Sequence, residues 1–112
     1  PRFMDATATA RGAKIVADLR TIDSAAMMYQ AKTGNLATSS GDLVTGTQST
    51  SYLAAWPTPP TGKAIVHCND GNDHALTSTS ARTYVFNATS SRGTMGDLTI
   101  DGILALTGDA AK

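Results

Sequence analysis

The first third of the chain constrains the fold more than any other segment, because it reads as one long helix. Residues 6–31 contain no Pro and one Gly, and good helix formers such as Ala, Arg, Leu and Met are frequent. The apolar residues recur at the spacing of a single helix face, and they are Ile15, Leu19, Ile22, Ala26 and Tyr29. Such a helix is about 42–45 Å long, so we expect its N-terminal half to project beyond a small domain.

The rest of the chain predicts a small antiparallel sheet. Residues 34–62 are rich in Thr, Ser, Gly and Pro and read as a loop that joins the helix to the sheet. Strands are expected at 64–68, 83–87 and 98–100, and Asp101-Gly102 suits a hairpin turn into a last strand at 103–106.

We therefore predict a single α+β domain over residues 1–112. It comprises a helix over 1–33, a loop over 34–62, and a three- to four-stranded antiparallel sheet with its loops over 63–112. The apolar face of the helix covers the sheet. The predicted core between helix and sheet consists of Ile15, Leu19, Ile22, Tyr29, Trp56 and Val85. For Trp56 the alternative is an exposed contact.

Charge and composition exclude several classes of function. The formal net charge is zero and the pI is about 7.3, so nothing indicates binding to nucleic acid or to an anionic membrane surface. No run of 18 apolar residues and no signal peptide occurs in this sequence. Cys68 is the only cysteine, which rules out a disulfide within the chain. The many Thr and Ser residues suit a surface outside the cytoplasm, or a low-charge domain of any origin.

The clusters of polar residues predict neither an enzyme nor a cofactor. The segment 69–73 (NDGND) is rich in oxygen ligands but lacks the spacing and the terminal Glu of a calcium loop, so we predict a turn. His67 and Cys68 are adjacent and would point to opposite faces of a strand, which argues against zinc and against a Cys–His nucleophile. Asn87-Ala88-Thr89 fits a glycosylation sequon that a Thr-rich chain readily produces by chance.

Several segments of the first 62 residues occur in a recognisable order. The helical part runs through 1–4 (PRFM), 10–15 (ARGAKI), 17–25 (ADLRTIDSA), 28–29 (MY) and 33–34 (TG). After it come 42–44 (DLV), 52–53 (YL) and 56–62 (WPTPPTG). Together they resemble the type IV pilin and type II secretion pseudopilin superfamily, taken up just after the membrane half of its helix. Residues 63–112 share only a generic β-rich character, and the lone Cys68 departs from the disulfide of many Gram-negative pilins.

The resemblance implies a structural subunit. A short basic leader, a prepilin-peptidase site and about twenty apolar residues would precede Pro1 and anchor the protein in the inner or cytoplasmic membrane. An ATPase and a platform protein would then build it into a helical filament with other pilins or pseudopilins. That filament is a surface pilus for adhesion, motility or DNA uptake, or a periplasmic pseudopilus for protein secretion. Major pseudopilins bind calcium in a C-terminal loop, which Asp97 and Asp101 match poorly.

The projecting half of the helix is the predicted filament contact. Its small residues would allow close helix approach, with Gly12 as a close-approach or bending point, and its charges would face either neighbouring subunits or solvent. Lys14 and Asp18 can also pair within the helix. The interface candidates are Pro1, Arg2, Phe3, Asp5, Ala8, Arg11, Gly12 and Lys14.

The alternative function is a small secreted binding module whose Thr- and Ser-rich loops hold a sugar or protein ligand. The two functions differ in what they require of the helix. A helix that stays exposed in the isolated domain favours the filament, and a helix packed along its whole length favours the binding module.

Overall fold

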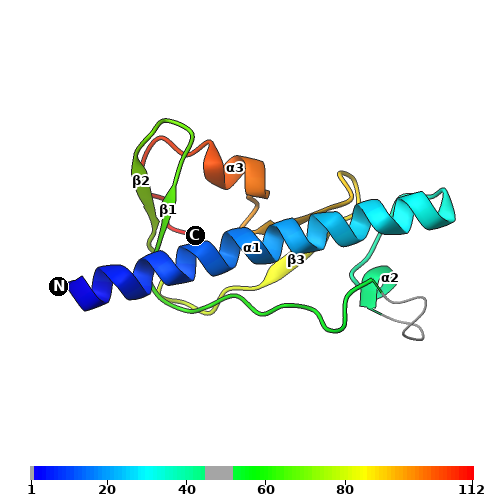
Figure 1. The fold of residues 1–112 in the computed structure, drawn as a ribbon, viewed down its shortest axis with the longest axis horizontal. Coiled ribbons are helices and arrows are strands. Elements are labelled where there is room, and N and C mark those ends of the chain that lie inside the picture. The colour runs from blue at the N-terminus through cyan, green and yellow to red at the C-terminus, as the bar shows by residue number, and fades with distance from the viewer. Residues whose placement is uncertain (1, 45–51) are drawn as a thin grey trace.

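The computed structural model describes residues 2–44 and 52–112, and for residues 2–5 it describes the backbone alone. The molecule measures 47 × 24 × 21 Å, because its first helix runs the whole length of the long axis (Figure 1). In chain order the elements are α1 (Arg2–Thr33), α2 (Gly41–Val44), β1 (Ala64–His67), β2 (Asp73–Leu76), β3 (Tyr84–Asn87), β4 (Arg92–Met95) and α3 (Ile100–Leu104).

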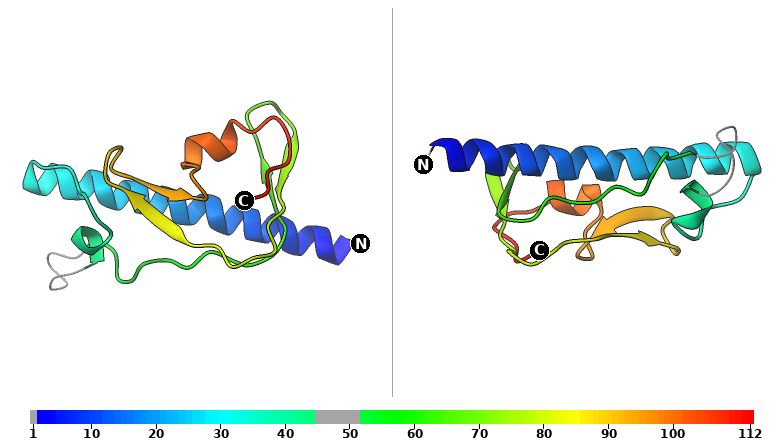
Figure 2. Two further views of the ribbon diagram at one scale, coloured as in Figure 1. Left: turned by 180° about the vertical axis from the view of Figure 1, so that it is seen from behind. Right: turned by 90° about the horizontal axis from the view of Figure 1, so that it is seen from below.

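The strands form two separate antiparallel hairpins on α1. β1 pairs with β2, and β3 pairs with β4, in two two-stranded sheets. All other elements lie on one side of α1, as the right-hand view of Figure 2 shows. The predicted α+β fold, a long helix on antiparallel strands, is therefore confirmed, whereas the single sheet of three to four strands is wrong. The turn predicted at 69–73 ends at Asn72, since Asp73 already pairs with His67 as the first residue of β2.

The predicted C-terminal strands at 98–100 and 103–106 are wrong, because α3 occupies this segment. Thr99 has extended backbone and caps the helix, its hydroxyl accepting a hydrogen bond from the Gly102 N–H at 3.2 Å. Ile100 and Ile103 lie three residues apart on one helix face and are both buried. The helix therefore places both side chains in the core. Asp101 and Gly102, which were expected to form a hairpin turn, lie within this helix instead.

The core lies between α1 and the two hairpins. Ile15, Leu19 and Ile22 are fully buried, and Tyr29 and Trp56 are partly buried and pack against the same cluster. The prediction that Val85 belongs to this core is wrong, because its side chain is 56% exposed. Strand side chains alternate between the two faces of a sheet. In β3 it is therefore the buried Tyr84 that faces the core, and Val85 next to it faces solvent.

The N-terminal half of α1 does not project freely. Ala8 is 2% exposed, Gly12 is buried, and β1 makes the closest approach to the helix at this level. A Cβ atom at Gly12 would lie only 1.8 Å from the carbonyl oxygen of Ile65. Gly12 is thus a point of close approach within the chain, and Ala8 and Gly12 are corrected from filament contacts to contacts with the rest of the domain.

Candidate functional site

The remaining predicted interface residues divide into two groups. Pro1 lies outside the described residues, and for Arg2, Phe3 and Asp5 the structure gives only the helical backbone. The other two are cations that contact the loop before β1. Arg11 donates from Nη1 to the Lys63 carbonyl oxygen at 3.2 Å.

Lys14 connects the helix both to itself and to the loop. Its Nζ lies 2.6 Å from an oxygen of Asp18, so the pair expected within the helix is present. The same ammonium donates to the Thr58 carbonyl oxygen at 3.0 Å. Lys14 and Arg11 therefore lie on the flank of α1 that contacts the loop.

No described element covers the side of α1 that faces away from the hairpins (Figure 2). We call this surface the bare face of α1. It consists mainly of small side chains at intervals of three or four residues, all of them exposed: Ala6, Ala10, Ala13, Ala17, Thr21, Ser24, Met28 and Ala31. Sequence reasoning identified the small residues near the N-terminus but not the continuation, because it expected subunit contacts only in the N-terminal half of the helix.

Two interactions around Tyr84 attach β3 and the loop to α1. The Tyr84 hydroxyl donates to Asp18 at 2.7 Å, and the Trp56 indole N–H donates to the Tyr84 carbonyl oxygen at 3.0 Å. Burial, followed by the hydrogen bond to Asp18, raises the pKa of the Tyr84 phenol well above its ordinary value. The phenol is thus a neutral donor to a carboxylate, which is a structural role.

This arrangement predicts a specific loss of stability in alkali. A tyrosine in the unfolded chain ionises at about pH 10, and the pKa of Tyr84 in the folded protein is higher. The contribution of Tyr84 to the free energy of unfolding is therefore fully present below that pH and is lost as the pH rises above it. In urea unfolding between pH 9 and 11.5, we expect the free energy of unfolding of Tyr84→Phe to fall less steeply than that of the parent, by up to about 1.4 kcal/mol per pH unit. Parallel pH profiles would contradict this account.

An ion-pair network joins α1, β4 and α3. Arg92 donates from Nε and Nη2 to one oxygen of Asp23 at 3.1 and 2.8 Å, and from Nη1 to Asp101 at 2.7 Å. The other oxygen of Asp23 accepts from the Gly93 N–H at 3.0 Å. Hydrogen bonds to Asp23 and then to Asp101 raise the pKa of Arg92. Asp101, a weak calcium candidate in the sequence, is thus occupied by a guanidinium.

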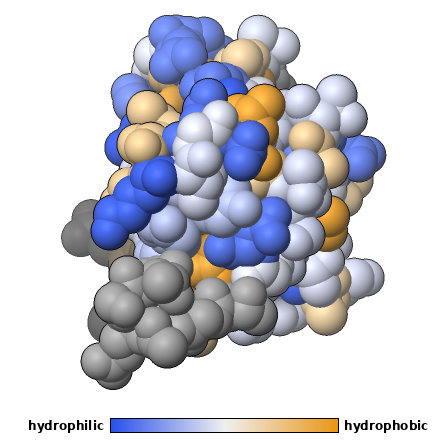
Figure 3. Space-filling view, turned by 90° about the vertical axis from the view of Figure 1, so that its right-hand side faces the viewer, coloured by the Kyte–Doolittle hydropathy of each residue, from blue (hydrophilic) through white to orange (hydrophobic). Residues whose placement is uncertain are grey.

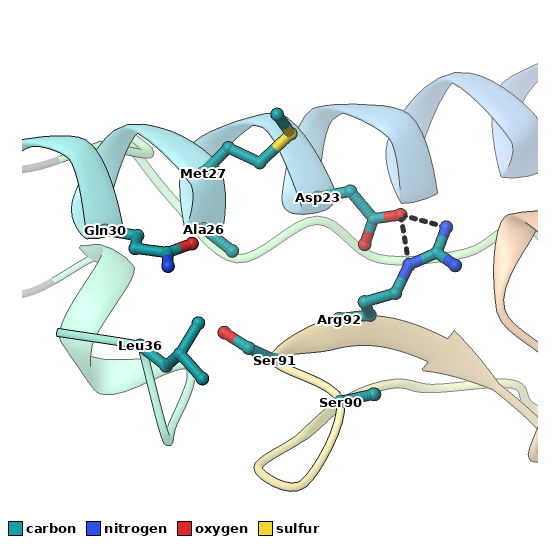
Figure 4. A pocket seen from close by; sticks show the side chains of 8 residues that line it. All are labelled: Asp23, Ala26, Met27, Gln30, Leu36, Ser90, Ser91 and Arg92. Atoms are coloured by element: carbon teal, nitrogen blue, oxygen red, sulfur yellow. Dashed lines mark hydrogen bonds and ion pairs between the residues drawn. The ribbon is translucent and has the colours of Figure 1, made fainter.

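An open groove lies beside this network, between α1 and the turn that joins β3 to β4 (Figure 4). Its volume is about 290 Å³, and Met27 and Leu36 at its rim are 70% and 53% exposed. Ser91 lines it with a positive φ of 54° and donates to the Ala37 carbonyl oxygen at 2.9 Å. The groove offers an apolar rim and a few hydroxyl and amide groups. Its charged members, Asp23 and Arg92, are bonded to each other.

The histidines each pair with an aspartate around the β1–β2 turn. His67 Nδ1 lies 2.8 Å from Asp73, and His74 Nε2 lies 2.7 Å from Asp70. The bond from His74, and then the Asn72 N–H, lower the pKa of Asp70. Within residues 2–44 and 52–112, no three His, Cys, Asp or Glu side chains are placed to bind one metal ion.

Cys68 is a buried thiol. Its Sγ donates to the carbonyl oxygens of Val66 and Ile103 at 3.5 and 3.4 Å. Burial first, and then the negative charges of Asp70 and Asp73, raise the pKa of this thiol. A nucleophilic cysteine needs the opposite shift, so the surroundings of Cys68 suit packing.

Arg82 is the residue that sequence reasoning missed. It lies in a stretch rich in Ser and Thr that reads as an outer loop, yet it is only 8% exposed. Its guanidinium donates to five backbone carbonyl groups from three segments, those of Pro60, Gly62, Leu76, Ser78 and Lys112. Burial, and then the positive charge of Arg11, lower the pKa of Arg82. No local sequence pattern predicts such a role, because all of its partners are backbone carbonyl groups and those of Pro60, Gly62 and Lys112 are far away in the sequence.

No protein family, curated protein or solved structure matches this chain. Among the described residues, no helix is both long and apolar enough to cross a membrane.

Proposed function

We propose that the chain is a structural subunit, a pilin or pseudopilin, of a helical filament. The observation that carries this proposal is the bare face of α1, which extends from Ala6 to Ala31 while the opposite face is buried. The pattern of segments in the first 62 residues, which resembles pilins and pseudopilins, supports it as well.

The bare face has the properties that helix packing between subunits requires. Ala, Ser and Thr side chains let two helix backbones approach closely, and these residue types make up seven of its eight members, the exception being Met28. In a helical assembly each copy uses different surfaces toward the copies before and after it, so the contact repeats without closing. In this proposal α1 lines the filament interior and the two hairpins lie outside.

The wider partners follow from the same proposal. An upstream apolar segment anchors the subunit in the inner or cytoplasmic membrane, a prepilin peptidase processes it, and an assembly platform adds it to other pilins or pseudopilins. The filament stands at the cell surface or in the periplasm. In this proposal the domain has no enzymatic role and needs no cofactor.

One observation favours the alternative, a secreted binding module for a sugar or protein ligand. Ala8 and Gly12 are packed down, so one face of α1 is covered along nearly its whole length, and the groove at Met27 and Leu36 is open. Figure 3 shows the face at the C-terminal end of α1. The apolar patches on this face are small and separated by polar ones. A module of this kind would bind its ligand as a monomer.

Cysteine cross-linking in the full-length encoded protein separates the two functions. Ala17 lies in the middle of the bare face and is exposed, whereas the native Cys68 is buried. In cells that make the protein, oxidation of Ala17→Cys should give a cross-linked dimer in the sheared filament fraction, because one accessible thiol per copy forms one disulfide. The matched control is the same variant oxidised after detergent has dissociated the filaments, which should give monomer. Monomer alone before and after detergent would contradict the filament and favour the binding module.

A further inference from the structure

Seven of the eight aspartates with described side chains accept a hydrogen bond from within the chain. These are Asp18, Asp23, Asp42, Asp70, Asp73, Asp101 and Asp109. Asp97 is the exception in the described part of the chain. Its side chain is 98% exposed, and its one ionic neighbour, Lys112 Nζ, is 3.8 Å away. At that distance, in full contact with water, the interaction is weak.

Asp97 lies in a tight turn to which it is suited. Met95 and Leu98 exchange both backbone hydrogen bonds, at 2.8 and 3.0 Å, across the two-residue turn of Gly96 and Asp97. Both turn residues have positive φ, 53° and 72°. Gly, Asn and Asp are the residues that adopt this conformation most readily. The turn holds the Asp97 carboxylate out into solvent, where no side chain of the described residues hydrogen-bonds to it.

Positive charge without a matching carboxylate gathers around Gly62. Arg11 and Arg82 donate to the adjacent carbonyl oxygens of Lys63 and Gly62, which brings both guanidinium groups to the same two residues. The exposed Lys63 ammonium has no partner among the described residues, and Arg11 uses one of its five N–H donors. Arg82 donates to backbone carbonyl groups. Arg11 and Lys63 are therefore open to a carboxylate.

We propose that Asp97 of one copy binds Arg11 and Lys63 of a neighbouring copy in the assembled filament. This proposal rests on the proposed function. In it, these three charged side chains set the position of one domain relative to the next. The partner is a second copy because the chain carries the complementary carboxylate itself. The zero net charge provides no general attraction to an anionic membrane surface. A carboxylate between a guanidinium and an ammonium gains charge-assisted hydrogen bonds at both.

Charge reversal in the full-length protein tests the contact. The readout is the fraction of protein recovered in pelleted filaments. We expect Asp97→Lys and Lys63→Glu each to reduce it about tenfold, because attraction becomes repulsion between like charges. The double variant Asp97→Lys/Lys63→Glu, and an equal mixture of the two single variants, should both recover most of the assembly. Asp97→Asn removes the charge but tolerates positive φ, so it should weaken assembly without lowering the thermal midpoint of the detergent-solubilised protein.

The matched control is Lys32→Glu, which makes the same charge change in the last turn of α1 and should leave assembly unchanged. If every variant assembles like the parent, the contact is wrong, while the cross-linked dimer of Ala17→Cys still supports the filament. If Lys63→Glu fails to assemble, Asp97→Lys assembles normally and the double variant is not rescued, an anion other than Asp97 binds the cations and the proposal is wrong. If Ala17→Cys gives no cross-linked dimer, the filament and this contact fail together.

Discussion

Replacing Gly12 by Ala is expected to lower the free energy of unfolding by about 2 kcal/mol, although Ala is the better helix former. The added Cβ would lie 1.8 Å from the Ile65 carbonyl oxygen, a backbone atom in β1. Overpacking against a rigid group costs up to about 3 kcal/mol, and the helix regains about 1 kcal/mol from the change of residue. The measurement is urea unfolding followed by far-UV circular dichroism.

The sign of this effect distinguishes close packing from helix propensity. Ala10 and Ala13 flank Gly12 on the same helix and are exposed. Ala13→Gly should cost about 1 kcal/mol from propensity alone, so both directions of exchange between Gly and Ala destabilise, for different reasons. A Gly12→Ala variant more stable than the parent would show that β1 can move away from α1 at little cost.

Replacing Arg82 by Met is expected to cost about 3–5 kcal/mol, enough to unfold much of a domain of ordinary stability. Met keeps the unbranched apolar part of the side chain but lacks the guanidinium and with it every donor. The backbone oxygens of Pro60, Gly62, Leu76 and Ser78 then lose a cationic partner together. A buried acceptor left without a partner costs about 1–3 kcal/mol, and water will restore some of these bonds at the edge of the site.

Two further variants define the role of Arg82. Arg82→Lys keeps the charge but offers at most three donors in place of five, so its stability should fall between those of the parent and Arg82→Met. Arg20→Met is the control, since Arg20 is exposed and has no partner among the described residues, and it should change stability by less than about 0.5 kcal/mol. Equal effects of Arg82→Met and Arg20→Met in thermal unfolding would overturn the role assigned to the buried guanidinium.

The sequence predicts the parts of this fold that depend on local periodicity. The spacing of Ile15, Leu19 and Ile22 specifies both the helix and its buried face, because i, i+4 and i+7 neighbours share one face whatever they pack against. The direction in which a strand faces is less certain. Val85 and Tyr84 both suit β-structure, and only the position of α1 decides which of them is buried.

The errors arise where pairing with distant residues decides. Asp73 belongs to a turn by composition but joins β2 because the strand opposite ends at His67. At Thr99 a helix cap and a strand residue look alike, and the burial of both Ile100 and Ile103 selects the helix. At the candidate site, small residues near the N-terminus indicated α1, but Ala8 and Gly12 lie on its buried face, because the approach of β1 to Gly12 was not expected.

The division of the strands into two hairpins has a consequence for the order of folding. Among the described residues, β1 pairs with β2 alone and β3 with β4 alone, so each ladder closes over a turn of a few residues. Loop-closure entropy is small for such pairings and large for strands distant in sequence. We therefore expect the docking of the hairpins on α1, rather than the pairing of the strands, to limit the rate of folding. The two hairpins can dock in either order. A substitution that slows the formation of one hairpin should therefore delay the docking of that hairpin and leave the docking of the other unchanged.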